Sequence, residues 1–392
     1  MQTLVFTFST VLLYAKIATV GEYIVTVGGL MAGIIIIANV YVNRDELRWT
    51  GSVMVAITAP VCIYLMHLIV GSTYAIEPQR FILSFGLWSV SAILIWCSFQ
   101  KYTLVNNPNV LWSLIILGIL GAAQFFGQTI LHSDFAYRLV APILSIDLYD
   151  SYVVNSDGSF DRAIGTYYEP SMFGRVVATL ITMLFIQTRS LIRPAAFFAL
   201  SLVTVRSLGM VALGGVNILL LYREFPRSFF YMMAALALSL TILPTFIADR
   251  VHEADPDAGF SSTYIRLVLP LEPLGELLQQ YPLGLPIGSN AKFVENTIAK
   301  NYNFEEAKIT NGLYELVMYF GVVAVIGIVI AIYYMIKAVT QKETNKALII
   351  AYLLLSTAVS SSYLSIESSL LTYFFIAAMR FIGRPRQLAQ ME

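Results

Sequence analysis

The sequence predicts an all-α, polytopic membrane protein in which residues 1–392 form one integral membrane domain. Its 392 residues are 58% hydrophobic and only 12% charged, and the mean hydropathy is +0.73. Apolar runs of membrane-spanning length recur from one end of the chain to the other. Because lipid offers no partners for backbone polar groups and the runs are too long for barrel strands, they are expected to be helices.

About twelve spans are expected. They include a retained first helix, since the N-terminal apolar stretch lacks a basic region and a small-residue cleavage site. The expected bounds are 3–19, 23–41, 52–70, 80–97, 110–131, 171–187, 195–204, 207–222, 228–247, 313–335, 346–361 and 365–381. The run 195–204 is too short to cross ~30 Å of hydrocarbon at ~1.5 Å per residue, so a short or broken helix is expected there. A count of eleven is the alternative, and it would place the two chain ends on opposite sides of the membrane.

The distribution of charge among the loops predicts on which side of the membrane each loop lies. One set of connecting segments holds thirteen Lys or Arg residues, whereas the short segments of the opposite face hold one, Arg206. The basic set comprises 42–51, 98–109, 186–194, 223–227, 336–346 and 380–392; the opposite set comprises 20–23, 71–79, 205–206 and 362–364. By the positive-inside rule both termini are expected in the cytoplasm, and the two long loops, 132–170 and 248–312, on the outer face.

Both long loops contain segments with structural signals. FAYRLVAPIL at 135–144 is apolar and aromatic enough to lie on the membrane surface. The stretch 262–280 has apolar residues at helical spacing between charged ones, which predicts a short interfacial amphipathic helix. YPLGLPIG at 281–288 contains two prolines and two glycines, which predicts a tight turn.

Composition excludes several kinds of site. The balance of 24 basic and 24 acidic residues gives no indication of a nucleic-acid partner. Cys62 and Cys97 lie inside apolar runs, where buried structural thiols are expected. The three histidines are too scattered for a metal cluster, and no cofactor is expected. An intramembrane acyltransferase would use a histidine, but His67, the one candidate, is more typical of a packing residue.

Three arginines of the outer face, Arg162, Arg206 and Arg266, are candidates for binding phosphate. The planar guanidinium pairs with phosphate through charge-assisted hydrogen bonds, and a low-dielectric membrane edge strengthens the attraction. A diphosphate leaving group needs several such cations where no metal is present. The alternative for each arginine is a side chain that reaches to the interface or pairs with a nearby carboxylate.

Glu169 is the candidate general base. Pro170 after it suits the first turn of a helix, so the carboxylate is expected at a helix N-terminus facing the outer compartment. There it is placed either to remove a proton from an acceptor hydroxyl or simply to stabilise the helix through its dipole. A cluster of this kind, DRAIGTYYEP at 161–170, is costly to keep at a membrane boundary without a use.

Two further acids, Glu315 and Glu367, lie near the outer ends of predicted spans. Acids at membrane depth are functional candidates, and salt bridges to the arginines are the equal alternative. Tyr167, Tyr168 and Tyr264 are candidates for stacking on sugar rings, although tyrosine is common at membrane interfaces.

Short motifs along the chain resemble one known family. They are K-I-A-x-x-G-E at 16–22, R-A-I-G-T-Y-Y-E-P-S-M-F-G at 162–174, V-R-S-L-G at 205–209, S-S-T-Y-I-R at 261–266, P-L-G-L-P-I-G at 282–288 and N-G-L-Y-E-L-V-M-Y-F-G at 311–321. Their order and their placement on one face resemble the Wzy-type polysaccharide polymerases, especially those of the colanic acid type, and the related O-antigen ligases.

The resemblance implies a GT-C-like fold in the bacterial inner membrane and a glycosyltransferase reaction on the periplasmic face. A glycan on undecaprenyl diphosphate would be transferred to a new lipid-linked repeat unit of an exopolysaccharide or O-antigen, with release of undecaprenyl diphosphate. No nucleotide or metal is implied. Arg206 and Arg266 would be catalytic together with Glu169, and Arg162, Tyr168, Tyr264, Asn311, Glu315 and Glu367 would bind substrate. Candidate partners are membrane lipid and, from the same pathway, a chain-length regulator and a flippase.

The sequence departs from the ligases at one place. They carry a His-Asn pair after the second long loop, whereas this chain reads Thr310-Asn311. That difference favours a polymerase over a ligase and moves the base role toward Glu169 or another carboxylate. The alternative from another class is a secondary transporter of a small solute, which predicts inverted repeats and ionisable residues deep in the bilayer. Here the charges concentrate at the outer edge instead.

Overall fold

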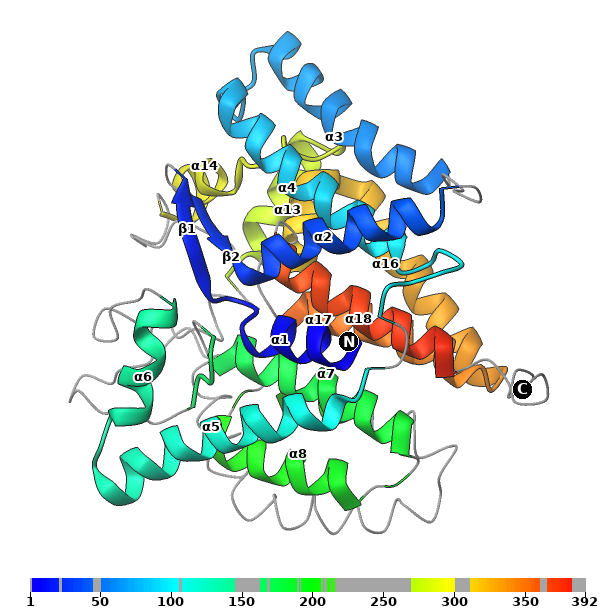
Figure 1. Ribbon diagram of the computed structural model, residues 1–392. Coiled ribbons are helices and arrows are strands. Elements are labelled where there is room, and N and C mark those ends of the chain that lie inside the picture. Colours follow the sequence, from blue (N-terminus) through cyan, green and yellow to red (C-terminus); the bar gives the residue numbers. More distant parts are fainter. Residues whose placement is uncertain are drawn as a thin grey trace.

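The computed structural model describes most of the chain, and the longest range outside the described residues is 216–268. The described residues are 2–20, 23–44, 51–105, 108–144, 163–167, 170–188, 190, 192–205, 207, 210–211, 213–215, 269–299, 311–359 and 365–382. Within them the architecture is helical, apart from one small hairpin (Figure 1). The predicted all-α fold class is therefore confirmed.

The N-terminal elements are α1 (Gln2–Val11), β1 (Lys16–Val20), β2 (Tyr23–Thr26), α2 (Val27–Val42), α3 (Gly51–Val70), α4 (Pro78–Cys97), α5 (Val110–Leu131) and α6 (Phe135–Leu144). They are followed by α7 (Pro170–Thr188), α8 (Ile192–Val205), α13 (Leu271–Gln280), α14 (Asn290–Val294), the π-helix η2 (Glu295–Ala299), α16 (Gly312–Thr340), α17 (Thr344–Val359) and α18 (Ile366–Ile382).

Five of the described helices are long and apolar enough to cross a membrane. They are α4, α5, α7, α16 and the part of α3 from Val53 to Val70. The helices α2, α6, α8 and α17 are apolar but shorter, so the predicted short helix at 195–204 is confirmed by the 14 residues of α8. The twelve-span count stays a prediction, because 228–247 and most of 207–222 lie outside the described residues.

The prediction of a first helix over 3–19 is wrong. The helix α1 ends at Val11, and the chain then forms the antiparallel hairpin of β1 and β2. These strands are rich in β-branched residues, and Gly21 follows the first of them in the sequence, a combination that favours a hairpin. The predicted start of the next span at residue 23 is wrong for the same reason, since α2 begins at Val27.

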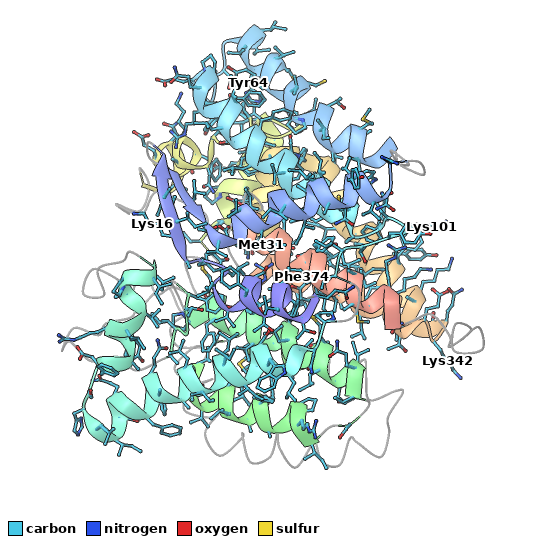
Figure 2. The ribbon with its side chains drawn as sticks, viewed as in Figure 1. Lys16, Met31, Tyr64, Lys101, Lys342 and Phe374 are labelled. Atoms are coloured by element: carbon cyan, nitrogen blue, oxygen red, sulfur yellow. The ribbon has the colours of Figure 1, made fainter. Side chains whose placement is uncertain are left out.

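The centre of the bundle is formed by α7 and α18. The first packs against α5, α8, α17 and α18, and the second against α2, α4, α7 and α17. Every residue of α7 from Phe173 to Ile186 is buried. Aromatic rings fill the space between helices, as where Phe374 meets Phe6 with ring centroids 4.9 Å apart (Figure 2).

Peripheral helices expose apolar side chains. In α16 the residues after Gly321 are largely exposed and include valines, isoleucines and tyrosines, a surface suited to lipid. The prediction of two buried cysteines holds for Cys97 and is wrong for Cys62, which is exposed. The reason is that α3 packs mainly against one neighbour, α4, and leaves its other faces open.

Helix ends that loop charge assigns to the cytoplasm lie together in the structure. Asn43, after α2, donates to the Tyr102 carbonyl at 2.9 Å, and Arg380 of α18 donates to the Ser98 carbonyl at 2.7 Å. Figure 2 shows Lys101 and Lys342 on the same side of the molecule, with Lys16 of the hairpin on the opposite side. Which side of the membrane these ends face stays a prediction.

The predicted tight turn at 281–288 forms hydrogen bonds to the backbone on both sides of a break in α16. Gly321 interrupts this helix with φ 55° and ψ −135°. Two backbone groups beside the break bond to the turn: Val322 N–H donates to the Pro282 carbonyl at 2.8 Å, and Leu285 N–H donates to the Met318 carbonyl at 2.7 Å. An interrupted helix at membrane depth is tolerated where protein satisfies its backbone in this way.

Two other elements, α3 and α13, hold this turn and α16 in place. His67 of α3 bonds through Nε2 to the Gly284 carbonyl at 2.9 Å, which agrees with the packing role expected from its sequence position. The predicted amphipathic helix is present as α13, which covers the last ten residues of 262–280 and packs against α16. Buried Leu274 and Leu277 form its inner face.

Candidate functional site

The middle of the DRAIGTYYEP segment, residues 163–167, is held by a buried glutamine of α5. The Gln124 Oε1 atom accepts hydrogen bonds from the Ile164 and Gly165 N–H groups at 3.0 and 2.8 Å, and its Nε2 donates to the Gly165 carbonyl at 3.0 Å. A loop in a membrane protein has to satisfy its backbone from within the protein. One amide therefore supplies three bonds that keep this segment in place.

The same segment caps the end of α1. Thr166 Oγ1 donates to the Val11 carbonyl, and the Tyr167 hydroxyl donates to the Thr10 carbonyl at 2.5 Å. The Tyr167 ring is fully buried against Phe173 and Tyr14, with both pairs of centroids 5.6 Å apart. The prediction that this ring stacks on a sugar is therefore wrong. Burial raises the pKa of Tyr167 well above its usual range, so its phenol stays protonated and keeps donating.

A carboxylate at the start of α18 lies beside this segment. Glu367 accepts a hydrogen bond on Oε1 from the Thr26 hydroxyl at 2.5 Å and one on Oε2 from the Ser365 hydroxyl at 3.0 Å. Thr26 ends the hairpin and also caps α2, where its oxygen accepts from Gly29 N–H at 3.0 Å. The hairpin that replaces the predicted first helix therefore delivers a hydroxyl to Glu367.

A buried arginine of α7 completes the cluster. Arg175 is 6% exposed, and its Nη1 donates to the Ser368 hydroxyl at 2.7 Å, one residue beyond Glu367. Tyr14 interacts electrostatically with both Glu367 and Arg175 and hydrogen-bonds with Ser365 and Ser368. Burial, together with the Glu367 charge, raises the pKa of Tyr14 to about 12, so this phenol is also a donor at neutral pH.

Sequence reasoning missed Arg175, Gln124 and the hydroxyls of Tyr14 and Thr26. Arg175 carried a usable signal, because an arginine inside an apolar span is a functional candidate by default. It follows directly after the motif that ends at Gly174. Gln124 gave a weaker signal of the same kind. The hydroxyl groups gave none, since Tyr and Thr are common in apolar runs and only the fold selects these two.

Asn311 and Glu315 form a second cluster at the start of α16. The Asn311 Oδ1 atom accepts from Leu313 N–H at 3.0 Å and caps the helix. Glu315 is 2% exposed and accepts from the Asn290 side chain at 2.8 Å. This cluster joins α14 to α16, whereas the Glu367 cluster joins the hairpin, α7 and α18.

Replacing Asn311 by Ala should destabilise the protein by about 1 kcal/mol, because the α16 N-terminus loses its cap. Asn311→Asp keeps a capping oxygen and should be close to wild type in thermal unfolding of the detergent-solubilised protein. If Asn311→Ala is neutral for stability while glycan synthesis falls, the side chain serves the substrate rather than the helix.

Three of the nine predicted site residues, Asn311, Glu315 and Glu367, are described, and the structure assigns them to two clusters. Glu169, Arg206, Arg266, Arg162, Tyr168 and Tyr264 lie outside the described residues. The described residues 163–167 and α7 nevertheless bracket Tyr168 and Glu169 in the sequence. Their roles remain predictions.

A comparison with known protein families shows to which family the chain belongs. Residues 1–381 match the family described as WcaD colanic acid polymerase. The chain belongs to the WcaD family. A search of curated proteins finds no match to the chain. The resemblance to Wzy-type polymerases is thereby confirmed, and membership of the WcaD family implies a polysaccharide polymerase that acts on lipid-linked oligosaccharide repeat units.

Proposed function

We propose that this protein polymerises undecaprenyl-diphosphate-linked oligosaccharide repeat units into an exopolysaccharide or O-antigen on the periplasmic face of the bacterial inner membrane. The observation that carries the proposal is the match to the WcaD family over 1–381. The apolar helices agree with a multi-pass membrane protein. Both termini would lie in the cytoplasm, as loop charge predicts.

The reaction needs a leaving-group site, a proton acceptor and a place for sugars. The acceptor hydroxyl oxygen forms a bond to the anomeric carbon of the growing glycan while the bond from that carbon to the diphosphate oxygen breaks. Arg206 and Arg266, with Arg162, would offset the charge of the departing diphosphate. A carboxylate, for which Glu169 is the sequence candidate, would take the hydroxyl proton.

The described geometry supports a site at this end of the bundle. Thr26 and Tyr14 near the N-terminus, Arg175 of α7 and Glu367 of α18 come from three distant parts of the sequence and meet in one cluster. The starts of α2 and α18, which loop charge assigns to the periplasm, are joined here by the bond between Thr26 and Glu367. Tyr168 and Tyr264 would stack on sugar rings, and Asn311 would bind substrate at the start of α16.

The test is synthesis by purified protein. The full chain in lipid nanodiscs, given a lipid-diphosphate repeat unit, should produce a ladder of longer glycans and release polyprenyl diphosphate. The absence of any ladder with the correct repeat unit, together with substrate-dependent solute transport by the same protein in vesicles, would show that the transporter alternative is right.

Arg206→Ala and Arg266→Ala should abolish the ladder while protein levels stay normal, because each removes a cation from the diphosphate. Replacement by Lys should restore activity only in part, since the planar fork is lost. Arg138→Ala is the control. Arg138 lies on α6 in the first long loop and pairs with Asp134 at the surface, so its loss should change nothing. A mutant at 206 or 266 that polymerises at the wild-type rate contradicts the role of that residue.

A further inference from the structure

Glu367 has the open hydrogen-bonding capacity that a proton acceptor requires. Its carboxylate is half-buried, and the described residues that bond to it are Thr26 and Ser365, one on each oxygen. An ionised carboxylate offers about four lone-pair positions. The described residues therefore leave two of these positions for a third hydroxyl group from outside the protein.

The two hydroxyl donors hold this carboxylate in one orientation. The α2 N-terminus also approaches it closely, because a Cβ added at Gly28 would lie 3.0 Å from Glu367 Cγ and 2.6 Å from the Leu13 carbonyl oxygen. The Leu13 carbonyl excludes a side chain at Gly28, and the α2 backbone therefore lies close to Glu367. A general base works best when its position is set before the substrate arrives.

The charges around Glu367 suit an ionised acid. Arg175 of α7 carries a buried positive charge, and it is bonded to Ser368, the residue that follows Glu367 in α18. Tyr14 is in electrostatic contact with both charges. A carboxylate in a poorly hydrated site needs such compensation to keep its charge.

The other described acid of the predicted site is not comparably placed. Glu315 is 2% exposed and bonded to Asn290, so neither a substrate hydroxyl nor the solvent reaches it readily. Glu367 is partly exposed and is held by hydrogen bonds from Thr26 and Ser365. A proton that it takes up can therefore return to water. The contrast between the two carboxylates favours catalysis at the α18 start and a structural role at the α16 start.

We propose that Glu367 is the catalytic carboxylate that accepts the proton from the acceptor-sugar hydroxyl, with Thr26, Ser365, Tyr14 and Arg175 as its positioning residues. This inference rests on the proposed polymerase function and deepens it, because it assigns the base to Glu367 rather than Glu169. As the new bond from hydroxyl oxygen to anomeric carbon forms, the proton moves to a Glu367 oxygen. The diphosphate leaves with the electron pair of its bond to that carbon.

The test compares Glu367→Gln with Glu169→Gln in the nanodisc synthesis assay, as a function of pH. Glu367→Gln should lower turnover about 10²- to 10⁴-fold with little change in KM, and the rise of turnover from acidic to neutral pH should disappear. Tyr14, the neighbouring phenol, is not expected to produce that acidic rise, because burial and the Glu367 charge raise its pKa to about 12. Glu276→Gln on the exposed face of α13 is the control and should be silent.

Two further measurements distinguish a catalytic role of Glu367 from a purely structural one. A small carboxylate such as formate should restore turnover to Glu367→Ala, which a structural loss would not allow. Thr26→Val, which removes one donor and leaves the carboxylate, should lower turnover about tenfold without raising KM. If Glu367→Gln does not fold, Thr26→Val and the wild-type pH profile decide, and unchanged turnover in Thr26→Val overturns the proposal.

Other outcomes are equally decisive. Near-normal turnover of Glu367→Gln, a defect confined to KM, or loss of the acidic rise in Glu169→Gln instead would each overturn the assignment to Glu367. Wild-type protein that makes no ladder contradicts the polymerase function itself. A ladder from wild type and Glu367→Gln alike contradicts only this inference.

Discussion

Gly321→Ala should destabilise the protein by about 2–5 kcal/mol and lower the yield of monodisperse protein in detergent. A Cβ at this position would overlap the Pro282 carbonyl oxygen, which has to stay in place to accept from Val322 N–H. The φ of 55° is also one that L residues rarely adopt. The turn and the helix break would separate, and the backbone groups of both would lose their partners.

Gly327→Ala, six residues further along α16, is the matched control. Nothing lies within 4 Å of an added Cβ there, and alanine favours a helix more than glycine does. The apparent unfolding temperature should therefore be unchanged or higher. Equal unfolding temperatures for the two variants would mean that the contact between the turn at 281–288 and α16 does not stabilise the protein.

Gln124→Leu should destabilise the protein by at least ~3 kcal/mol, because it leaves three buried backbone groups of 164–165 without partners. The leucine keeps the side-chain volume similar and so isolates the loss of polar contacts. Since residues 163–167 lead toward Tyr168 and Glu169, synthesis should fall together with stability. Thermal unfolding and the glycan ladder measure the two effects on the same preparation.

Gln128→Leu is its control, one helical turn further along α5. Gln128 is half-buried and has no hydrogen-bond partner among the described residues. This exchange should be nearly neutral in both measurements. A similar loss in both variants would show that α5 tolerates no apolar residue on this face, and the bonds from Gln124 would not be the cause.

The sequence predicted the helical segments well where an apolar run is long and bounded by turn residues. The span expected at 110–131 matches α5, and 171–187 lies within α7. The first span failed because hydropathy measures whether a segment suits an apolar environment, and not which secondary structure it adopts. The β-branched residues of 16–26 carried that second piece of information.

The candidate site was less predictable. Charged residues near loops are visible in a sequence, which is why Glu367 was selected. Its partners are hydroxyl groups on the hairpin, a tyrosine after α1 and an arginine of α7, and only tertiary packing brings them together. Arg175 was not among the predicted site residues, although an arginine within an apolar run is costly to bury and therefore informative.

The lengths of α2 and α18 bear on the shape of the bilayer around the protein. At ~1.5 Å per residue, their 16 and 17 residues extend ~24 and ~26 Å, less than the ~30 Å of a typical hydrocarbon layer. Both begin at the Glu367 cluster, Val27 directly after Thr26 and Ile366 directly after Ser365. We expect the membrane to be thinned above this point, so that water reaches the cluster from the periplasm. A lipid-linked sugar would then descend to the carboxylate while its polyprenyl chain remains in the bilayer.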